Sequence, residues 1–556
     1  MKTTRKKGIQ FFVQSLVDSG LKHVVCSPGS RNAPMVIAFD AHPGIETSVV
    51  HDERTAAFFA MGIAEQQKTP VAVVCTSGSA MLNYYPAVAE AHYRNIPLVV
   101  ISADRPTEWV DHGDGQTIVQ RGVYQNHIRG EYEIDEFGKR EDIRSVVKMA
   151  MSNAVYGWTG PIHFNVPLTE PLYELEELEI ESVIESLDRT ESGVDGSNID
   201  DFVREWESHD KKMILCGQLP RNGALANQLE LLADDSSVIV LVENTSNLPN
   251  KRFIHCIDRT LAGIADEDIE SYKPTMLLTV GGAVISKRIK AFLRNSPITS
   301  HWKIGHDFPE MDTYRKLTNS VQVRPVEFLQ KVQLQDFKRH QSTYGNRWKQ
   351  LDYLIQDRVK NALVDFPYSD LKVFEVLFDF IPEGVHLHQG NSSVVRYGQL
   401  FDPIQSIAYY GNRGTSGIDG STSTAVGHAF VSKDCHVLIS GDVSFFYDSN
   451  AFWNQQLTSN LRVILINNGG GGIFRIIPGP RGTEQLERYF EAKHDHRAEH
   501  LCKAHNVEYI CVSSLSELES EMHVFYQESD RPKLIEVITP HDVNDEVLKA
   551  FFDSAK

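Results

Sequence analysis

Short runs of β-branched and aliphatic residues alternate with helix-length segments along most of the chain, and this alternation constrains the fold more than any other feature. Such runs lie at 24–26, 71–75, 98–101, 213–216, 238–242, 276–280, 385–388, 406–409, 435–440, 461–466 and 533–537. Strands that alternate with helices are typical of a parallel sheet covered by helices on both faces. The sequence therefore predicts an α/β protein with three doubly wound parallel sheets.

The length of the chain supports a division into several domains. At 556 residues it is too long for one hydrophobic core. An acidic stretch with Ser and Gly at about 174–201 has the composition of a linker, and a polar helical segment at about 336–362 connects the second and third units. We expect three domains, at 1–180, 195–335 and 345–556.

Composition narrows the function classes. The net charge of −19 argues against a general nucleic-acid or anionic-membrane surface. The seven cysteines form no CxxC pair, which fits reduced thiols in a cytoplasmic protein. No apolar run approaches 18 residues, so we expect no membrane span. The basic start leads into an amphipathic helix and does not resemble a signal peptide.

Polar residues follow two neighbouring strands of the predicted C-terminal sheet. Asp442 comes directly after the run at 435–440, and Asn468 follows it after 25 intervening residues, behind the run at 461–466. A helix-length segment at about 448–458 connects the two strands, as a right-handed crossover requires. Ligands of open parallel sheets bind outside the carboxyl ends of the strands. Both side chains are therefore expected in one crevice.

The oxygens of these side chains and of a glycine-rich turn are hard ligands that suit Mg²⁺. Because Mg²⁺ completes its shell with water and phosphates, the segment predicts a diphosphate held through a metal. The alternative is a tight turn with a capping aspartate.

The segment resembles the thiamine-diphosphate (ThDP) signature, Gly-Asp-Gly followed some two dozen residues later by Asn-Asn, with Val443 in place of the third glycine. The resemblance implies pyrimidine-binding, central and diphosphate-binding domains. It implies that Asp442, the Asn468 side chain and the Gly470 carbonyl hold Mg²⁺ or Mn²⁺. The backbone around Gly441, Val443 and Ser444 would hold the diphosphate.

ThDP chemistry also needs a carboxylate that hydrogen-bonds to the aminopyrimidine ring, and Glu53 is the candidate. It follows a β-branched run and precedes an apolar helix, where burial should raise its pKa. The alternative is a helix-terminal Glu favoured by the macrodipole. A second loop, Thr76-Ser77-Gly78, could contact the pyrimidine, or could be an ordinary turn. In ThDP enzymes the two domains of one site come from different subunits, which implies a homodimer or homotetramer.

Further strings narrow the resemblance: SPGSR at 27–31, ADRP at 103–106, NSSVVR at 391–396 and NRGTSGIDG at 412–420. Together they resemble the 2-succinyl-5-enolpyruvyl-6-hydroxy-3-cyclohexene-1-carboxylate (SEPHCHC) synthases of menaquinone biosynthesis, over about residues 8–537. That family usually lacks the third glycine, so Val443 is expected, whereas Gly469 stands where Asp or Asn is usual. The resemblance implies that 2-oxoglutarate is decarboxylated and added in a 1,4 sense to isochorismate.

Both substrates are dianions, so the site needs cations, and arginine meets a carboxylate bidentately. The candidates are Arg31, Arg105, Lys287, Arg288 and Arg396. For each of them, a surface ion pair is the alternative. By resemblance, Ser30, Gln116 and Ser392 would hydrogen-bond to substrate or intermediate, and Ile473 and Phe474 would form an apolar wall. Ile418 would support the bent cofactor, with Asn391, Ser392, Arg413 and Ile473 beside it.

Several other functions stay open. One is an acetolactate-synthase-like carboligase or decarboxylase; another is a non-catalytic ThDP-fold protein. The prediction of nucleotide binding at 280–283 is weaker, because the full GxGxxG fingerprint is missing and a plain strand-to-helix turn explains the glycines. His386 and His388 in a strand, and His494, His496 and His500 in a polar helical region, have spacings that can bind Zn²⁺. Without a completing Cys or carboxylate set, we interpret them as structural or solvated.

Overall fold

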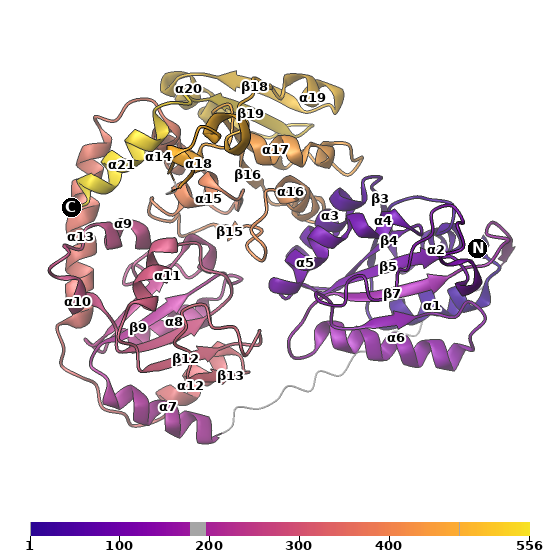
Figure 1. The fold of residues 1–556 in the computed structure, drawn as a ribbon, viewed down its shortest axis with the longest axis horizontal. Helices are drawn as coiled ribbons and strands as arrows, with labels where there is room; N and C mark the ends of the chain where they lie inside the picture. Colours follow the sequence, from indigo (N-terminus) through magenta and orange to yellow (C-terminus); the bar gives the residue numbers. More distant parts are fainter. Residues whose placement is uncertain (1, 178–195, 477–478) are drawn as a thin grey trace.

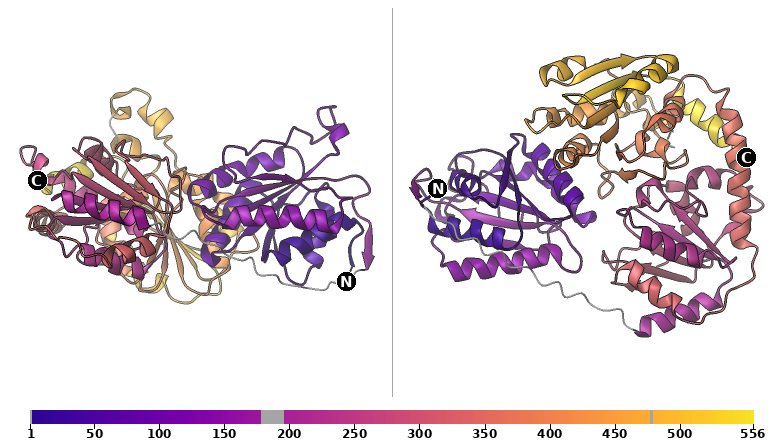
Figure 2. Two further views of the ribbon diagram at one scale, coloured as in Figure 1. Left: turned by 90° about the horizontal axis from the view of Figure 1, so that it is seen from below. Right: turned by 180° about the vertical axis from the view of Figure 1, so that it is seen from behind.

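A computed structural model describes residues 2–177, 196–476 and 479–556. Figure 1 shows three α/β units, with the C-terminal unit beside both of the others. The two further views in Figure 2 show the same arrangement. A cavity of about 780 Å³ is lined by residues of all three units, among them Arg94, Gln218 and Tyr410. Among the described residues, no helix has the length and apolar character needed to cross a bilayer.

The N-terminal unit is built on a six-stranded sheet with the order β3-β2-β4-β5-β7-β6, in which all neighbours are parallel. Its strands are β2 (His23–Cys26), β3 (Glu46–Val49), β4 (Val71–Cys75), β5 (Leu98–Asp104), β6 (Glu131–Glu133) and β7 (Ile162–Pro167). Its helices are α1 (Lys7–Asp18), α2 (Ala33–Ala41), α3 (Glu53–Gln67), α4 (Ser79–Asn83), α5 (Tyr85–Tyr93) and α6 (Arg140–Val155). Apolar clusters cover both faces of the sheet, so the inner strand β4 is apolar along its whole length, whereas the outer strands β3 and β6 carry polar residues.

The central unit has a five-stranded parallel sheet with the order β10-β9-β11-β12-β13. Its strands are β9 (Lys212–Cys216), β10 (Val238–Val242), β11 (Met276–Val280), β12 (Ser300–Ile304) and β13 (Asn319–Val321). Its helices are α7 (Gly196–Ser208), α8 (Gly223–Leu232), α9 (Ile257–Ala262), α10 (Ile269–Tyr272), α11 (Lys287–Arg294) and α12 (Pro325–Gln333).

The C-terminal unit has a six-stranded parallel sheet with the order β15-β14-β16-β17-β19-β18. Its strands are β14 (His386–Gln389), β15 (Ala408–Tyr410), β16 (His436–Gly441), β17 (Leu461–Asn467), β18 (Glu508–Val512) and β19 (Lys533–Ile538). Its helices are α14 (Asp370–Phe380), α15 (Ser393–Gly398), α16 (Ser421–Phe430), α17 (Asp442–Tyr447), α18 (Ile473–Ile476), α19 (Glu499–Ala504), α20 (Leu515–Phe525) and α21 (Asn544–Ser554).

Two helices join the units. The first turns of α13 (Tyr344–Leu363) bury Tyr344 and Trp348 in the central core, and its later turns bury Ile355 and Val359 in the C-terminal core. The predicted polar connector is therefore a helix shared by two cores. Helix α3 of the N-terminal unit packs against α16 of the C-terminal unit.

Three sequence-based expectations need correction. The linker is shorter than predicted, because β8 (Leu175–Glu177) pairs antiparallel with β1 (Lys2–Thr4) and α7 begins at Gly196; the intervening part lies outside the described residues. The predicted helix at 448–458 is wrong: α17 begins at Asp442 and a short 3₁₀ turn follows at Ser449–Phe452. The chain leaves the helix there because the buried Asp448 carboxylate turns inward to accept hydrogen bonds from Ser423.

The third correction concerns the C-terminal histidines. His494 and His496 lie in a loop before α19, where their rings stack, and only His500 lies in a helix.

Candidate active site

We call the segment at 468–472 the metal loop, after the prediction made from the sequence. It is organised around Asp442, the first residue of α17. One carboxylate oxygen accepts the backbone N–H groups of Gly469 and Gly470, at 2.8 and 3.0 Å, and the other accepts that of Val443 at 2.6 Å. Strands β16 and β17 are parallel neighbours, so their carboxyl ends present these residues at one edge. Asp442 and Asn468 therefore lie at one edge of the sheet, as predicted.

Burial raises the pKa of Asp442 to about 7, and the nearby Asp370 carboxylate adds to the shift. The backbone N–H groups oppose it without cancelling it. A cation bound beside this carboxylate would oppose the shift and keep Asp442 ionised.

Asn468 supplies a second oxygen. Its Nδ2 donates to Asp370 at 2.9 Å, while its Oδ1 is buried and has no hydrogen-bond partner. Asp370 is itself fixed by Thr539, whose hydroxyl donates to it at 2.5 Å. This network orients the unpaired amide oxygen of Asn468, and an unpaired buried oxygen is costly unless a ligand satisfies it. With Asp442 and the Gly470 carbonyl, these donors fit a hard divalent cation.

Two glycines of this loop have backbone conformations with positive φ, and the conformation at Gly470 requires glycine. Gly470 has a φ of 154°, and a Cβ there would lie 2.7 Å from the Glu491 carbonyl oxygen. Gly469 has a φ of 78°, in the left-handed region that glycine, Asn and Asp all adopt. Gly469, which stands where the family usually has Asp or Asn, can therefore adopt the same backbone conformation as those residues.

The residues predicted around the cofactor form one hydrogen-bonded group. Asn391 donates to the Asn412 and Gly417 carbonyls at 2.7 and 2.6 Å and accepts from Arg413 at 2.5 Å. The Ser444 hydroxyl donates to the Ile418 carbonyl at 2.7 Å, and the Ile418 side chain is 37% exposed. These contacts connect the loop at 412–418 to Gly441 and Asp442.

The neighbouring residues of this unit complete one side of the site. Ser392 has a φ of 72° and is the N-cap residue of α15. Ile473 and Phe474 begin α18 directly after the metal loop and are half-buried, and the Phe474 ring lies 5.7 Å from that of Phe490. His494 lies with Nε2 3.5 Å from Asp442.

Glu53 is the first residue of α3, as predicted, and follows the N-cap residue Asp52, which accepts the Thr55 N–H. The carboxylate is half-buried, and Asn83 lies within 3.5 Å of it. Burial raises the pKa of Glu53, and the nearby Asp52 adds to the shift. This is the direction that a proton-exchanging carboxyl needs.

The loop after β4 contacts a second loop of the N-terminal unit. The Ser77 hydroxyl donates to the Gln116 carbonyl at 2.9 Å, and the Gly78 N–H donates to the buried Gln120 side chain at 2.8 Å. Gly78 has a φ of 80°, and a Cβ there would lie 2.8 Å from Gln116 backbone atoms. Thr76 packs against Gly29, next to Ser30.

The cations of the N-terminal unit already have partners. Arg31 donates to the Leu168 carbonyl at 3.0 Å and pairs with Glu170 at 3.1 Å. Arg105 donates to the Gly115 carbonyl at 2.7 Å and pairs with Asp114 at 3.2 Å. The Ser30 hydroxyl lies 3.2 Å from that of Tyr173. All of these loops follow strands at the carboxyl edge of the N-terminal sheet.

The remaining cations lie where the central and C-terminal units meet. Lys287 and Arg288 begin α11 and are exposed, and the Arg288 guanidinium lies 4.3 Å from the centre of the Phe552 ring. Arg396 on α15 lies 3.5 Å from the Ile285 carbonyl. Burial raises the pKa of Asp258, and the charges of Arg288 and Arg396 oppose that shift.

The predicted residues thus form two groups, one on the N-terminal sheet and one on the C-terminal sheet with α11. Within the described ranges, no hydrogen bond or ion pair joins Glu53 to Asp442 or Asn468. The neighbours of Glu53 do reach the C-terminal unit: Arg54 donates to the Tyr447 carbonyl at 2.6 Å, and Asn450 donates to Asp52 at 2.7 Å.

Several residues of these networks were missed from sequence. Asp370 begins α14, Gln120 lies in a loop, and neither belongs to a recognisable motif. Glu90 on α5 accepts the N–H groups of Gly414 and Thr415 at 2.8 and 2.6 Å, and so holds the loop that carries Ile418. Glu243 accepts the N–H groups of Ile285 and Ser286. Such residues are recruited by tertiary contacts, for which the sequence carries no local signal.

Comparison with known proteins agrees with this geometry. Residues 6–128 match the family described as thiamine pyrophosphate enzyme, N-terminal TPP binding domain. The fold is similar to that of benzoylformate decarboxylase from Polynucleobacter necessarius, with a TM-score of 0.70 over 97% of this chain and 99% of that one, at 16% identity. Fold and site together define an enzyme of the thiamine-diphosphate class.

Full-length relatives narrow the class. SEPHCHC synthases from Christiangramia forsetii and Flavobacterium johnsoniae are each 42% identical to this chain over 97% of its length, and cover 97% and 98% of their own. The SEPHCHC synthase from Bacteroides thetaiotaomicron is 36% identical over 99% of both chains. The chain belongs to the SEPHCHC synthase family.

Proposed function

We propose that the protein is a ThDP- and metal-dependent carboligase that decarboxylates 2-oxoglutarate and adds the succinyl carbanion equivalent to isochorismate. The products are SEPHCHC and CO₂, in menaquinone biosynthesis. The observation that carries the proposal is the 42% identity to synthases of that name across 97% of the chain.

The metal site is assigned to three oxygens at the carboxyl ends of β16 and β17. They are the Asp442 carboxylate, the unpaired Oδ1 of Asn468 and the Gly470 carbonyl, and they would hold Mg²⁺ or Mn²⁺. The backbone at Gly441, Val443 and Ser444 would hold the diphosphate. When bound, the cofactor supplies the nucleophilic carbon and the electron sink that decarboxylation requires.

Glu53 is assigned the proton-holding role. Its carboxyl would hydrogen-bond to the pyrimidine ring nitrogen, with Thr76, Ser77 and Gly78 lining the ring. Because burial raises the pKa of Glu53, the group can hold and release a proton closer to neutral pH than an exposed glutamate.

Substrate carboxylates are assigned to the cationic residues. Arg31 and Arg105 are paired with Glu170 and Asp114, which are 67% and 42% exposed at the side chain, so a substrate carboxylate can compete for both guanidinium groups. Arg396, Arg288 and Lys287 would bind substrate carboxylates from the side where the central and C-terminal units meet. Ser30, Gln116 and Ser392 would donate hydrogen bonds, while Ile418, Ile473 and Phe474 would supply apolar contacts and exclude water.

We infer that the active protein is at least a homodimer, as the family resemblance implies. Large apolar side chains are exposed close to both halves of the site, including Leu82 (43%) beside Asn83 and Trp453 (52%), which stacks on His51. Exposed apolar groups of this size favour coverage by a partner.

The test is an assay of purified protein with ThDP, Mg²⁺, 2-oxoglutarate and isochorismate, following isochorismate by absorbance and product by mass. We expect consumption that requires the cofactor and 2-oxoglutarate and yields the succinyl adduct. Turnover of pyruvate in place of 2-oxoglutarate would instead support an acetolactate-synthase-like enzyme. Bound ThDP without any turnover would indicate a non-catalytic member of the fold.

A further inference from the structure

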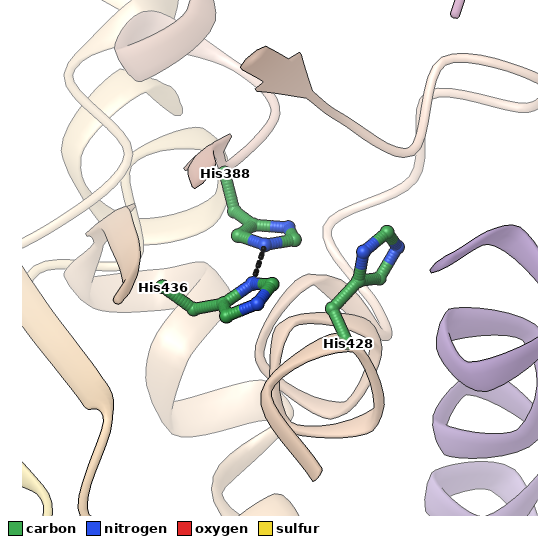
Figure 3. Close-up of side chains that lie close together, drawn as sticks. All are labelled: His388, His428 and His436. Atoms are coloured by element: carbon green, nitrogen blue, oxygen red, sulfur yellow. Dashed lines mark hydrogen bonds between the residues drawn. The ribbon is translucent and has the colours of Figure 1, made fainter. Parts of the chain in front are cut away.

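Three histidines that are distant in sequence meet inside the C-terminal unit. His388 comes from β14, His436 from β16 and His428 from α16, and Figure 3 shows their rings gathered together. One ring nitrogen of each lies within 4.8 Å of the others. The side chains are 4%, 0% and 0% exposed. His436 begins β16 and Asp442 follows its other end, so the cluster lies roughly 17 Å along the strand from the metal loop.

The electrostatics at His388 and His436 favour neutral imidazoles, which are the form that binds metals. Burial lowers the pKa of His388 well below its usual value and lowers that of His436 to about 2, and the neighbouring histidines add to both shifts. The Nε2 of His388 lies 3.1 Å from the Nδ1 of His436, so these nitrogens share a proton. The other nitrogen of His436, Nε2, is buried without a partner.

Outer contacts hold the third imidazole in place. Nε2 of His428 lies 3.0 Å from a Glu65 oxygen, and Nδ1 lies 3.2 Å from the Gln66 side-chain oxygen, both on α3. Although burial opposes it, the Arg94 guanidinium and the hydrogen bond from His428 hold the pKa of Glu65 at about 2, so Glu65 is ionised. A carboxylate that accepts a hydrogen bond from a histidine is the usual outer partner of a metal-bound imidazole.

Room for one further ligand lies beside the cluster. A cavity of about 10 Å³ is lined by His388, Glu65 and Tyr410 together with neighbouring polar residues. This is about the volume that one ordered water needs. Three imidazole nitrogens and one oxygen make a four-coordinate set of the kind that Zn²⁺ prefers.

We propose that His388, His428 and His436 form a Zn²⁺ site, with a water in the cavity beside His388 as the fourth ligand. The Nε2 of His388 and the Nδ1 of His436 would bind the ion, and the proton that His436 carries on Nδ1 would move to its own free Nε2. His428 would bind through Nδ1 in place of its contact with Gln66, while its Nε2 keeps the proton that it donates to Glu65. The three imidazoles therefore neither gain nor lose a proton when the ion binds. The ion would tie β14, β16 and α16 together beside α3, the helix that begins with Glu53.

This site differs in class from the one at Asp442. Imidazole nitrogens select Zn²⁺ and related transition metals, whereas the oxygens at Asp442, Asn468 and Gly470 select Mg²⁺ or Mn²⁺. The two ions can therefore be distinguished in one sample. Nothing in the proposal depends on which substrates the enzyme uses.

The test measures bound zinc in full-length protein that is saturated with Mg²⁺ and ThDP, after gel filtration, by elemental analysis. Wild-type protein should retain one equivalent of zinc, and His436→Gln should lose it. The matched control is His386→Gln, because His386 lies two residues from His388 in β14 and stacks on the His436 ring, while its own nitrogens face Tyr410 and Asp434. This control should keep the equivalent. Zinc-free wild-type protein, or an unchanged equivalent in His436→Gln, would overturn the proposal.

A second measurement does not depend on the folding of a variant. Co²⁺ added to wild-type protein in excess Mg²⁺ should give the intense visible absorption of a four-coordinate cobalt site, and stoichiometric Zn²⁺ should abolish it. If Co²⁺ shows only the weak spectrum of a six-coordinate ion, the three imidazoles are a hydrogen-bonded network of the core and the site is refuted.

Discussion

The N-terminal and C-terminal sheets have the same strand order, yet they carry different chemistry. Counted within each unit, both sheets run 2-1-3-4-6-5, and every neighbouring pair is parallel. The third strand of the C-terminal sheet, β16, ends at Asp442 and the metal loop. The third strand of the N-terminal sheet, β4, ends at Thr76, and its unit instead carries Glu53 at the start of α3. With the roles proposed above, one scaffold would supply either a cation site or a proton-exchanging group, depending on a few residues at strand ends.

The helices α3 and α16 occupy equivalent places in the two units, between the second and third strands, and pack against each other. Their backbones approach closely at two glycines. A Cβ on Gly62 would lie 2.3 Å from the Thr424 carbonyl oxygen, and one on Gly427 would lie 2.1 Å from that of Phe59. The N-terminal and C-terminal units therefore pack against each other through equivalent helices.

The largest effect is expected at the metal loop. Asp442→Asn removes the charged ligand, so we expect at least about a 100-fold loss of carboligation and of Mg²⁺-dependent ThDP binding. Both can be measured by titration of the purified variant. Asp448→Asn is the matched control, because Asp448 is also buried but its carboxylate accepts hydrogen bonds from Ser423 instead of from the loop at 469–470. It should lower stability and leave metal affinity unchanged; equal loss of affinity in both variants would contradict the assignment.

The corresponding change in the N-terminal unit should separate chemistry from binding. Glu53→Gln keeps the shape and removes the exchangeable proton, so we expect turnover to fall by about 100-fold while ThDP still binds. Asp52→Asn is the control, since Asn also caps helices well and the loss should stay within a few-fold. Undiminished turnover in Glu53→Gln would show that another group holds the proton.

The central unit offers a pH test. Burial raises the pKa of Glu243 to about 7. Between its usual value of 4.5 and about 7 the folded state binds the extra proton, so stability falls as pH rises through this window, by about 3 kcal/mol in total. Thermal unfolding of wild type and Glu243→Gln from pH 5 to 8 should show a smaller decline in the variant. Parallel curves would mean that Glu243 does not titrate there.

The smallest effect should come from the helix contact. Gly427→Ala forces α3 and α16 apart, and we expect a loss of about 1–3 kcal/mol in the free energy of unfolding. Gly223→Ala is the control, because no atom lies within 4 Å of its added Cβ. It should change stability by less than about 0.5 kcal/mol. Chemical denaturation measures both, and a similar result for the two glycines would show that the helices can separate without cost.

Much of the fold was predictable because buried parallel strands are apolar along their whole length. The runs at 71–75 and 238–242 coincide with β4 and β10. The polar strand β6 gave no such signal and was missed, and the partly exposed strand β18 was missed as well. The crossover helix was misplaced because Asp448 turns inward to Ser423, a tertiary contact that overrides local propensity.

The site was predictable where it depends on strand ends and not where it depends on distant partners. Asp442 and Asn468 meet because parallel neighbours end at one edge. Asp370, which orients Asn468, comes from a helix about a hundred residues away in sequence. The gathering of His388 with His428 and His436 was missed for the same reason, since only the sheet register brings β14 and β16 together.

We propose that Glu53 of the N-terminal unit and Asp442 of the C-terminal unit serve one ThDP site, and that these two residues come from two copies of the chain. Mixing and refolding equal amounts of the inactive Glu53→Gln and Asp442→Asn variants tests this directly. Half of the dimers would then be mixed, each with one intact site, so about a quarter of wild-type carboligation should return. No recovery in verified mixed dimers would contradict the shared site, because each intact Glu53 would then act only with the Asp442 of its own chain.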